Sequence, residues 1–522
     1  MAGNKTCKYA LLSVFDKTGI VDFARSIASL GYKIISTGGT AKVLQQNNVK
    51  IIPIQEITKN PESFDGRMKT ISFQVESGIL YDRTNPSHIK EAKALNIKPI
   101  DIVACNLYPF EKTISNPKVK PENAIGSIDV GGPTMIRAAA KNYKNVIVIT
   151  NPNDYDGVSS SLDSAEVSEA KRKELAAKAF AHLSFYDSLI ARFLGRDLFP
   201  EELTIAGRKT MMLRYGENPH QKAYVYMFPN TNSPLKNLKK EWGRELSYVN
   251  LTDINAGLEA VRLFKEPAAA VIKHNSPCGL ALGKDVSLAL KRAIESDPES
   301  AFGGIIVLNK KMNLKEAKVI GEFKDTRHAN IDIVAVPKIE KKALSYLEKL
   351  RKSMGIYTFG KISRKRSHNE SIKWVDGGFI VQTGDYDIEK SFKNWKVVTK
   401  KKPSSNQDSQ MKIAWKFISR IRSNAIIVVD KKLPMTRGIG SGQTSRVRST
   451  KIALEQAGKY AKGAILASDS FFPFDDSVKL AAKYGICAIV QQGGSINDKL
   501  SIDAANKAGL SMVFTGRRSF WH

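Results

Sequence analysis

The first 150 residues alternate between short apolar runs and segments in which apolar residues recur at helical spacing. Tyr9 to Val14 is one such run, and apolar residues then repeat every three to four positions from Ile20 to Leu30, where Gly31 ends the predicted helix. Tyr32 to Ile35 predicts the next strand. Further buried strands are predicted at residues 49–54, 100–105 and 146–149. This alternation predicts an α/β fold with a mainly parallel sheet covered by helices on both faces.

The pattern changes near residue 200. Residues 171–194 have helical spacing, and residues 196–208 then mix Pro, Gly and charged side chains, so the predicted domains are 1–200 and 201–522. A break within the second domain is predicted near 361–403, which is dense in Lys and Arg and lacks long periodicity. The strand-like runs of this domain lie at 268–272, 304–308, 425–429, 464–466 and 487–490.

The two halves of the second domain show a formal likeness. Each has a strand, a polar loop, a helix and a Ser-x-Phe turn, at Ser300 to Gly304 and at Ser470 to Phe474. The likeness is compatible with an internal duplication but is too faint to establish one.

Composition narrows the class of protein. The 522 residues are 42% hydrophobic and 25% charged, which is typical of a globular protein and argues against disorder, collagen or a coiled coil. The formal net charge of +30 favours anionic partners: nucleic acid, an acidic membrane or phosphorylated small molecules. The four cysteines form no CxxC pair, no apolar run spans a bilayer, and the N-terminus lacks a secretory core. We therefore expect a soluble cytoplasmic protein.

A glycine-rich segment, Ser36-Thr-Gly-Gly-Thr40, lies between a predicted strand and a predicted helix. Glycines let backbone N–H groups converge, and a helix N-terminus adds partial positive charge, which together suit a phosphate. A tight turn with a threonine cap is the commoner structure for such a motif. The polar run Ser13 to Gly19 follows the neighbouring strand, however, and parallel strands would bring both loops to one carboxyl edge, where α/β proteins bind ligands.

Three other segments are candidates for acid–base chemistry. Lys273-His274 directly follows an apolar strand and precedes a turn, which suits general acid–base catalysis, although a single histidine is more often structural. Asp129 opens a helix that reaches Lys141, and it is either a helix cap or part of a proton-transfer pair. Gly66 to Thr70 adds two cations and is alternatively a solvated loop.

The remaining polar segments indicate binding. Asn106 and Tyr108 follow a buried strand and are aimed at its edge, and Gly438 to Arg446 is a glycine-rich turn suited to an anion. Ser468 to Asp476 places three aromatic residues beside acids, which fits either a core or a flat heterocycle. No HExxH, GxSxG, HxE–CxxC or kinase motif is present, so neither a catalytic metal nor a serine hydrolase is expected.

Taken in order over nearly the whole chain, these motifs resemble the bifunctional purine-biosynthesis family that combines AICAR formyltransferase with IMP cyclohydrolase. The segments that carry the resemblance are Leu12-Ser-Val-Phe-Asp-Lys-Thr-Gly19, Ser36-Thr-Gly-Gly-Thr-Ala41, Gly66-Arg-Met-Lys-Thr70, Ala104-Cys-Asn-Leu-Tyr-Pro-Phe110, Asp129-Val-Gly-Gly, Arg137-Ala-Ala-Ala-Lys-Asn142, Arg214-Tyr-Gly-Glu-Asn-Pro-His-Gln221, Lys273-His-Asn-Ser-Pro, Gly438-Ile-Gly-Ser-Gly-Gln-Thr-Ser-Arg446 and Ser468-Asp-Ser-Phe-Phe-Pro-Phe474.

The resemblance implies a methylglyoxal-synthase-like N-terminal domain that carries the cyclohydrolase. It also implies a C-terminal formyltransferase region of two cytidine-deaminase-like subdomains without a catalytic zinc. The expected chemistry is formyl transfer from 10-formyltetrahydrofolate to AICAR, which gives FAICAR, followed by dehydrative cyclisation to IMP. A homodimer is expected, with formyltransferase sites at the subunit interface.

The resemblance also assigns residues to roles. It implies that Lys273 and His274 catalyse formyl transfer and that Asn424 orients the formyl group. For cyclisation it implies that proton transfer and oxyanion stabilisation come from Lys69, Tyr108, Asp129 and Lys141. The substrate-binding residues that it implies are Ser13, Lys17, Ser36, Gly39, Thr40, Arg67, Thr70, Asn106 and Gly131 in the first domain, and Arg214, Tyr215, Asn255, Arg446, Phe471, Asp476 and Arg518 in the second.

One departure and two alternatives qualify this interpretation. After Lys69-Thr70 the family usually has His-Pro and a second His, whereas Ser72 and Glu76 stand at those histidine positions here. We favour local repacking, because the proposed acid–base residues remain. The charge and the basic 361–403 stretch also fit a nucleic-acid-binding protein, but no nucleic-acid-binding motif supports it. A lone cyclohydrolase with a degenerate second domain is disfavoured by the intact Lys273-His274.

Overall fold

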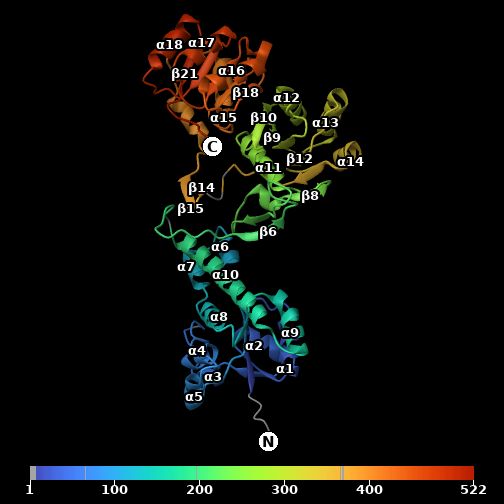
Figure 1. Ribbon diagram of the computed structural model, residues 1–522, viewed down its shortest axis with the longest axis vertical. Helices are drawn as coiled ribbons and strands as arrows, with labels where there is room; N and C mark the ends of the chain where they lie inside the picture. The colour runs from blue at the N-terminus through green and yellow to red at the C-terminus, as the bar shows by residue number, and fades with distance from the viewer. Residues whose placement is uncertain (1–6, 65, 196, 365, 367–368) are drawn as a thin grey trace. The chain divides into compact units, whose positions relative to one another are not determined.

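The computed structural model describes residues 7–64, 66–195, 197–364, 366 and 369–522. The first six residues, which bear on the expected lack of a secretory signal, and positions 365, 367 and 368 of the basic stretch lie outside the described residues. The chain divides into two compact units (Figure 1). Unit 1 comprises residues 1–208 and 228–230, and unit 2 comprises residues 209–227 and 231–522.

Unit 1 is built on a five-stranded, wholly parallel sheet in the order β3-β2-β1-β4-β5. This confirms the parallel sheet predicted from the apolar runs. The chain adds strands on one side of β1 and then returns to add β4 and β5 on the other, so the connections diverge between β1 and β4. In α/β sheets, ligands bind at the carboxyl edge beside such a point. The strands are β1 (Lys8–Val14), β2 (Tyr32–Ser36), β3 (Ile51–Pro53), β4 (Ile102–Asn106) and β5 (Ile147–Ile149).

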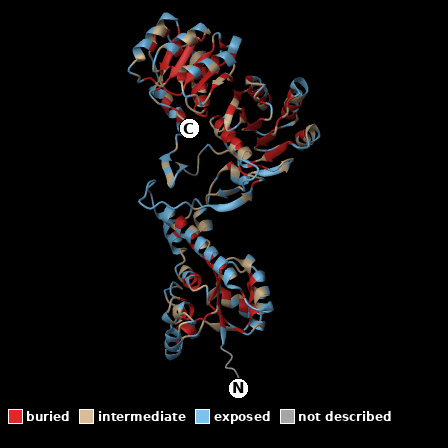
Figure 2. Ribbon diagram, viewed as in Figure 1, coloured by how far each residue is buried: buried red, intermediate tan, exposed pale blue. Residues whose placement is uncertain are grey.

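The helices of unit 1 bury one apolar face each against the sheet or a neighbouring helix. In α1 the buried residues are Ile20, Phe23, Ala24 and Ile27, the spacing of one helical face. Figure 2 shows the buried strands at the centre of this unit. The helices are α1 (Ile20–Ser29), α2 (Gly38–Gln46), α3 (Gln55–Thr58), α4 (Phe73–Leu80), α5 (Pro86–Ala94), α6 (Phe110–Ile114), α7 (Pro121–Gly126), α8 (Gly131–Lys141), α9 (Tyr155–Ser164) and α10 (Glu169–Leu194).

Unit 2 contains two six-stranded sheets with one topology. Their orders are β10-β9-β11-β12-β13-β8 and β18-β17-β19-β20-β21-β16, and each has a central parallel trio flanked by antiparallel neighbours. The first sheet contains β8 (Lys239–Trp242), β9 (Ala268–Lys273), β10 (Ser276–Leu282), β11 (Ile305–Leu308), β12 (Ile333–Val336) and β13 (Gly355–Thr358). The second contains β16 (Lys396–Val397), β17 (Ile426–Val429), β18 (Thr436–Gly440), β19 (Ile465–Ser468), β20 (Ala488–Gln491) and β21 (Ser511–Phe514).

The helices repeat as well, in matching places between the strands. The first half contains α11 (Tyr248–Val261), α12 (Val286–Ser296), α13 (Leu314–Arg327) and α14 (Lys341–Leu350), and the second contains α15 (Ser405–Ile418), α16 (Arg446–Ala457), α17 (Asp476–Lys483) and α18 (Asp498–Lys507). The hairpins β6 (Arg208–Met212) with β7 (Tyr224–Met227) and β14 (Glu370–Val375) with β15 (Gly378–Thr383) lie outside the repeat.

The duplication extends to single glycines. A Cβ atom built on Gly279 of β10 would lie 1.9 Å from the carbonyl oxygen of Ala293 in α12. A Cβ atom on Gly438 of β18 would lie 1.9 Å from that of Ala453 in α16. Both halves therefore need glycine where an edge strand crosses its following helix. The two Ser-x-Phe turns are not equivalent, however, because one precedes β11 and the other follows β19.

The two sheets of unit 2 meet along their edge strands β10 and β18. Leu280 N donates to Thr436 Oγ1 (3.1 Å), Ala281 and Met435 form an antiparallel bridge, and Leu282 N donates to a backbone carbonyl at 2.8 Å. The antiparallel register places the start of β10 at the same end of the join as the finish of β18. The β9–β10 turn therefore lies at the same end as the segment that enters β17.

The structure offers no candidate membrane span, since none of the helices in its described ranges combines the necessary length and apolarity. Within the same ranges, no three His, Cys, Asp or Glu side chains gather as a metal-binding group.

Candidate active sites

The first candidate site lies at the carboxyl edge of the unit 1 sheet, around the start of α2. A Cβ atom built on Gly38 would lie 3.7 Å from Lys69 Nζ, and one on Gly39 would lie 3.9 Å from Lys17 Nζ. Two ammonium groups thus border a helix N-terminus that itself carries partial positive charge. The neighbouring Thr37 is buried, and its Oγ1 has no hydrogen-bond partner among the described residues. The arrangement suits a phosphate.

Ser36 and Thr40 hold this edge together. Ser36 is fully buried and its Oγ donates to Leu12 O at 2.8 Å. Thr40 Oγ1 donates to Val14 O (2.9 Å) and accepts from Val14 N (3.0 Å). Both hydroxyl groups, which the resemblance assigned to substrate, tie β2 and α2 to the end of β1.

The loop that follows β1 is fastened by Asn106 at the end of β4. Its Oδ1 accepts from Phe15 N (2.6 Å) and Asp16 N (2.8 Å), and its Nδ2 donates to Asp16 O (3.2 Å). Lys17 folds back on this loop, where its Nζ donates to Phe15 O at 3.2 Å and burial lowers its pKa. Ser13 is half-buried at the end of the same strand.

Asp129 lies at the centre of the candidate acid–base groups. Its Oδ1 accepts from Gly132 N at 2.8 Å, so the helix-cap interpretation is correct for that oxygen. Burial raises its pKa, and the hydrogen bonds from the backbone of Gly132 and Tyr108 together with the charge of Lys69 partly oppose the rise. Lys69 also pairs with Glu62 at 2.9 Å. A carboxyl that can accept a proton and a cation therefore lie near each other, beside the sheet edge that suits a phosphate.

The other predicted residues of unit 1 differ in position. Thr70 is buried, and its Oγ1 lies 2.7 Å from where a Cβ of Gly131 would stand, at the start of α8. Arg67 is exposed on the preceding loop, and Tyr108 is half-exposed with its ring edge-on to Phe15. Lys141 is exposed at the end of α8.

The second candidate site is built on the turn between β9 and β10. Lys273 pairs with Ser276, so His274 and Asn275 form a two-residue hairpin loop, with φ of 53° and 58°. Positive φ at both positions is typical of a type I′ turn, and Asn and His are both enriched at positive φ. Lys273 Nζ donates to Phe302 O at 2.8 Å. An imidazole on the turn and an anchored ammonium thus come from consecutive residues at a strand end.

A buried carboxylate on α11 supports this turn. Asp253 accepts from Asn275 N at 2.5 Å and is 4% exposed. Burial raises its pKa, and the Asn275 hydrogen bond and the nearby His274 partly oppose the rise. Asn255, which the resemblance proposed, is exposed two residues further along the helix. Asp253 is therefore the acidic group of α11 that faces the turn.

The turn meets the other half of unit 2 through Arg422. With its side-chain amide oriented to suit its neighbours, Asn275 accepts from Arg422 Nη2 (2.9 Å) and donates to Thr252 O (3.2 Å). Ser423 N donates to Trp521 O at 3.0 Å, and the Arg422 guanidinium lies 5.3 Å from the Trp521 ring centre. The C-terminal segment therefore packs against the residues that precede Asn424.

Asn424 belongs to a buried polar network centred on Asp469. Its Oδ1 accepts from Arg446 Nη2 (2.7 Å) and its Nδ2 donates to Gln443 O (2.9 Å). Arg446 Nη1 pairs with Asp469 at 2.5 Å, and the Asp469 side chain is completely buried. The other Asp469 oxygen accepts from Ser423 Oγ at 2.6 Å. Asp469 thus orients both Asn424 and Arg446, and Arg446 is buried in the fold.

The remaining predicted residues of unit 2 are exposed or half-buried. Arg214 is exposed and donates to the Tyr215 hydroxyl at 2.8 Å, in a segment that bonds to the start of α11. Phe471 is half-buried and Asp476 is exposed at the start of α17. Arg518 is exposed over the Phe520 ring at 4.3 Å.

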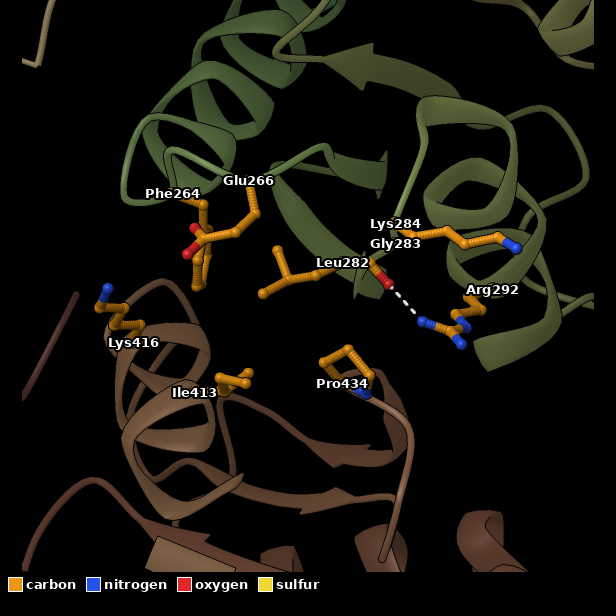
Figure 3. Close-up of a pocket in the computed structure, with 9 residues that line it drawn as sticks. All are labelled: Phe264, Glu266, Leu282, Gly283, Lys284, Arg292, Ile413, Lys416 and Pro434. Carbon is orange, nitrogen blue, oxygen red and sulfur yellow. Dashed lines mark hydrogen bonds between the residues drawn. The ribbon is translucent and has the colours of Figure 1, made fainter. Parts of the chain in front are cut away.

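A groove of about 280 Å³ occupies the opposite end of the β10–β18 join (Figure 3). Leu282 lines it from the first half and Ile413 and Pro434 from the second, and Arg292 donates to Leu282 O at 2.8 Å. The groove contains no residue that the sequence predicted for a site.

Comparison with known proteins decides the family. Residues 139–456 match the family described as AICARFT/IMPCHase bienzyme, and residues 19–134 match the MGS-like domain. The chain belongs to the AICARFT/IMPCHase bienzyme family. It is 45% identical over 519 residues to the bifunctional purine biosynthesis protein PurH of Thermoanaerobacter sp. (strain X514). The match covers 99% of this chain and 100% of the relative. It is 44% identical over 521 residues to PurH of Bacillus cereus (strain 03BB102), with the same coverage.

A solved structure titled "Crystal structure of ForH" is 33% identical, covers 36% of this chain and 99% of that one, and has a TM-score of 0.33. The family matches confirm the expected order of an MGS-like domain followed by the formyltransferase region.

Several residues of this bienzyme's candidate sites were missed by sequence reasoning. Thr37 and Asp469 lie inside motifs that were singled out, so a search for every hydroxyl and carboxyl group in those motifs would have found them. Arg422 lies two residues before Asn424, so its closeness to that residue was the signal in the sequence. Asp253 lies inside a helix, and only the fold brings it to the β9–β10 turn.

Proposed function

We propose that this chain catalyses the last two steps of IMP synthesis: formyl transfer from 10-formyltetrahydrofolate to AICAR, which gives FAICAR, and cyclisation of FAICAR to IMP. The observation that carries the proposal is the presence of two separate polar sites, one in each unit, on a chain whose family joins the two activities. A lone cyclohydrolase would not need the Lys273-His274 turn and its buried support.

For formyl transfer, we assign His274 as the base. The 5-amino nitrogen of AICAR is a poor nucleophile, so it must lose a proton as it attacks the formyl carbon. His274 accepts that proton, and Lys273 stabilises the developing oxyanion or protonates the leaving folate nitrogen. Asp253 holds the turn by its bond to Asn275 N.

For cyclisation, we assign Asp129 and Lys69. The carboxamide nitrogen of FAICAR attacks its own formyl group and water leaves, so holding the reactive conformer is much of the task. Asp129, with its raised pKa, exchanges the proton, and the Lys69 ammonium stabilises the oxyanion. Lys17 and the start of α2 bind the phosphate, and Tyr108 borders the site at the carboxyl edge of the sheet. We also assign Lys141 to this proton transfer, as the resemblance implies.

The partners follow from these steps. The substrates are phosphorylated imidazole nucleotides and an acidic folate, which suit a basic protein better than DNA does. We propose a cytoplasmic homodimer with formyltransferase sites at the subunit interface, because the resemblance implies it.

A coupled assay tests the proposal. Purified protein supplied with AICAR and 10-formyltetrahydrofolate is expected to form IMP without a second enzyme. Chromatography that separates FAICAR from IMP measures both products. Accumulation of FAICAR that is never cyclised would refute the cyclohydrolase half. Absence of both products, together with steep salt-dependent binding to duplex DNA, would favour the nucleic-acid alternative.

A further inference from the structure

A pocket of about 300 Å³ lies in unit 1 between α4 and α5, outside both candidate sites. Its walls are mostly apolar, with Phe73 and Leu80 on the α4 side and Leu95 and Ile97 beyond α5. Phe73 is 60% exposed, which is high for a large apolar side chain. The other lining residues are Glu76, Ser77, Tyr81, His88, Glu91 and Ala92. Its volume is at the lower end of that of small-molecule sites.

Glu76 gives this pocket its chemistry. Its Oε1 is shielded from solvent and has no hydrogen-bond partner among the described residues. Burial raises the pKa of the Glu76 carboxyl to about 7, and no neighbouring cation opposes the rise. A carboxyl that has one oxygen shielded from solvent without a partner is costly, and a bound cation would reduce that cost.

None of the residues that line the pocket is a lysine or an arginine. His88 Nδ1 accepts from Asp82 N at 3.2 Å. Glu91 contributes a second carboxyl on α5. Ser72, at the other replaced histidine position, is already used, since it caps α4 by accepting from Val75 N at 3.2 Å. Glu76 is therefore the replacement that lacks a structural partner.

We propose that this pocket binds a small organic cation, a primary ammonium on an aromatic or branched apolar body. The ammonium pairs with the Glu76 carboxylate, with Glu91 adding negative potential. The apolar body covers Phe73, Leu80 and Leu95. The family pattern has a histidine where Glu76 stands, so the negative charge that selects a cation belongs to this chain.

The test uses the full chain and 2-phenylethylamine as the probe, with 2-phenylethanol as the uncharged isostere, in titration calorimetry near pH 8. Saturable binding of the amine is expected, at least about tenfold tighter than that of the alcohol. The isosteric Glu76→Gln variant is expected to lose that tenfold preference. Asp22→Asn, which changes an exposed carboxylate on α1 of the same unit, is the matched control and should bind as the wild type does.

The affinity should also rise between about pH 6 and 8 in the wild type and not in Glu76→Gln, because the carboxyl must ionise to pair with the amine. Equal binding of amine and alcohol, unchanged binding by Glu76→Gln, or no saturable binding would each overturn the proposal. None of these outcomes depends on either enzymatic activity.

Discussion

At the residue scale, the second site depends on a left-handed turn and one buried carboxylate. His274 and Asn275 occupy consecutive positive-φ positions, and Asp253 fixes the second of them through its backbone N–H. Asp253 therefore holds in place the turn that carries His274.

Asp253→Asn should therefore weaken formyl transfer without unfolding the protein. We expect kcat to fall about 10- to 100-fold. Asp325→Asn, the same change at an exposed position on α13 of the same unit, should leave kcat unchanged. A folded Asp253→Asn protein with the wild-type kcat would contradict this role.

Glu76 predicts a pH dependence of stability. Its folded pKa of about 7 exceeds the ordinary value of 4.5, so the folded state binds more protons and the free energy of unfolding falls as pH rises from about 4.5 to 7. The shift corresponds to about 3 kcal/mol, of which partial exposure leaves about 1–2 kcal/mol measurable. Urea denaturation of wild type and Glu76→Gln at pH 5 and 8 measures it. The variant should lose less stability between the two pH values, and identical losses would contradict the assignment.

At the element scale, the duplication of unit 2 accounts for where the site lies. Since β10 and β18 run antiparallel at the join, the end of β9 in one half meets the entry to β17 in the other. Strands rich in Val, Ile and Ala were predictable from sequence, as in β9 and β17. The edge strands β10 and β18 were not, because Ser, Pro, Thr and Gly interrupt their apolar runs.

Only part of each candidate site could be predicted from the sequence. Motifs on loops after buried strands, such as Lys273-His274, showed themselves in the sequence because polar residues directly follow apolar ones. The bond from Asn275 to Asp253 spans 22 residues and two elements, and no local pattern reports it.

Gly279→Ala and Gly438→Ala test the packing of the repeat. Each added methyl group would meet a helix carbonyl at 1.9 Å, so strand and helix must separate. We expect each variant to lose about 1–3 kcal/mol of unfolding free energy in urea. Gly378→Ala, where no atom lies within 4 Å, is the control and should change stability by less than about 0.5 kcal/mol. A Gly279→Ala protein as stable as the control would contradict this packing.

At the scale of the whole molecule, the proposed function divides the chemistry between the two units. Unit 1 carries the cation-lined edge with Asp129, and unit 2 carries the β9–β10 turn. The sites use few of the 81 Lys and Arg residues, so the net charge of +30 is mainly a property of the rest of the chain.

The central claim is that each unit catalyses one step, and separate single-site variants test it most directly. Lys273→Ala should convert supplied FAICAR to IMP at the wild-type rate yet form no FAICAR from AICAR and 10-formyltetrahydrofolate. Lys69→Ala should form FAICAR from AICAR and 10-formyltetrahydrofolate at the wild-type rate but should not convert it to IMP. FAICAR should therefore accumulate. Both variants must first show wild-type circular dichroism. A folded Lys273→Ala protein that has lost both activities would contradict the two-site account.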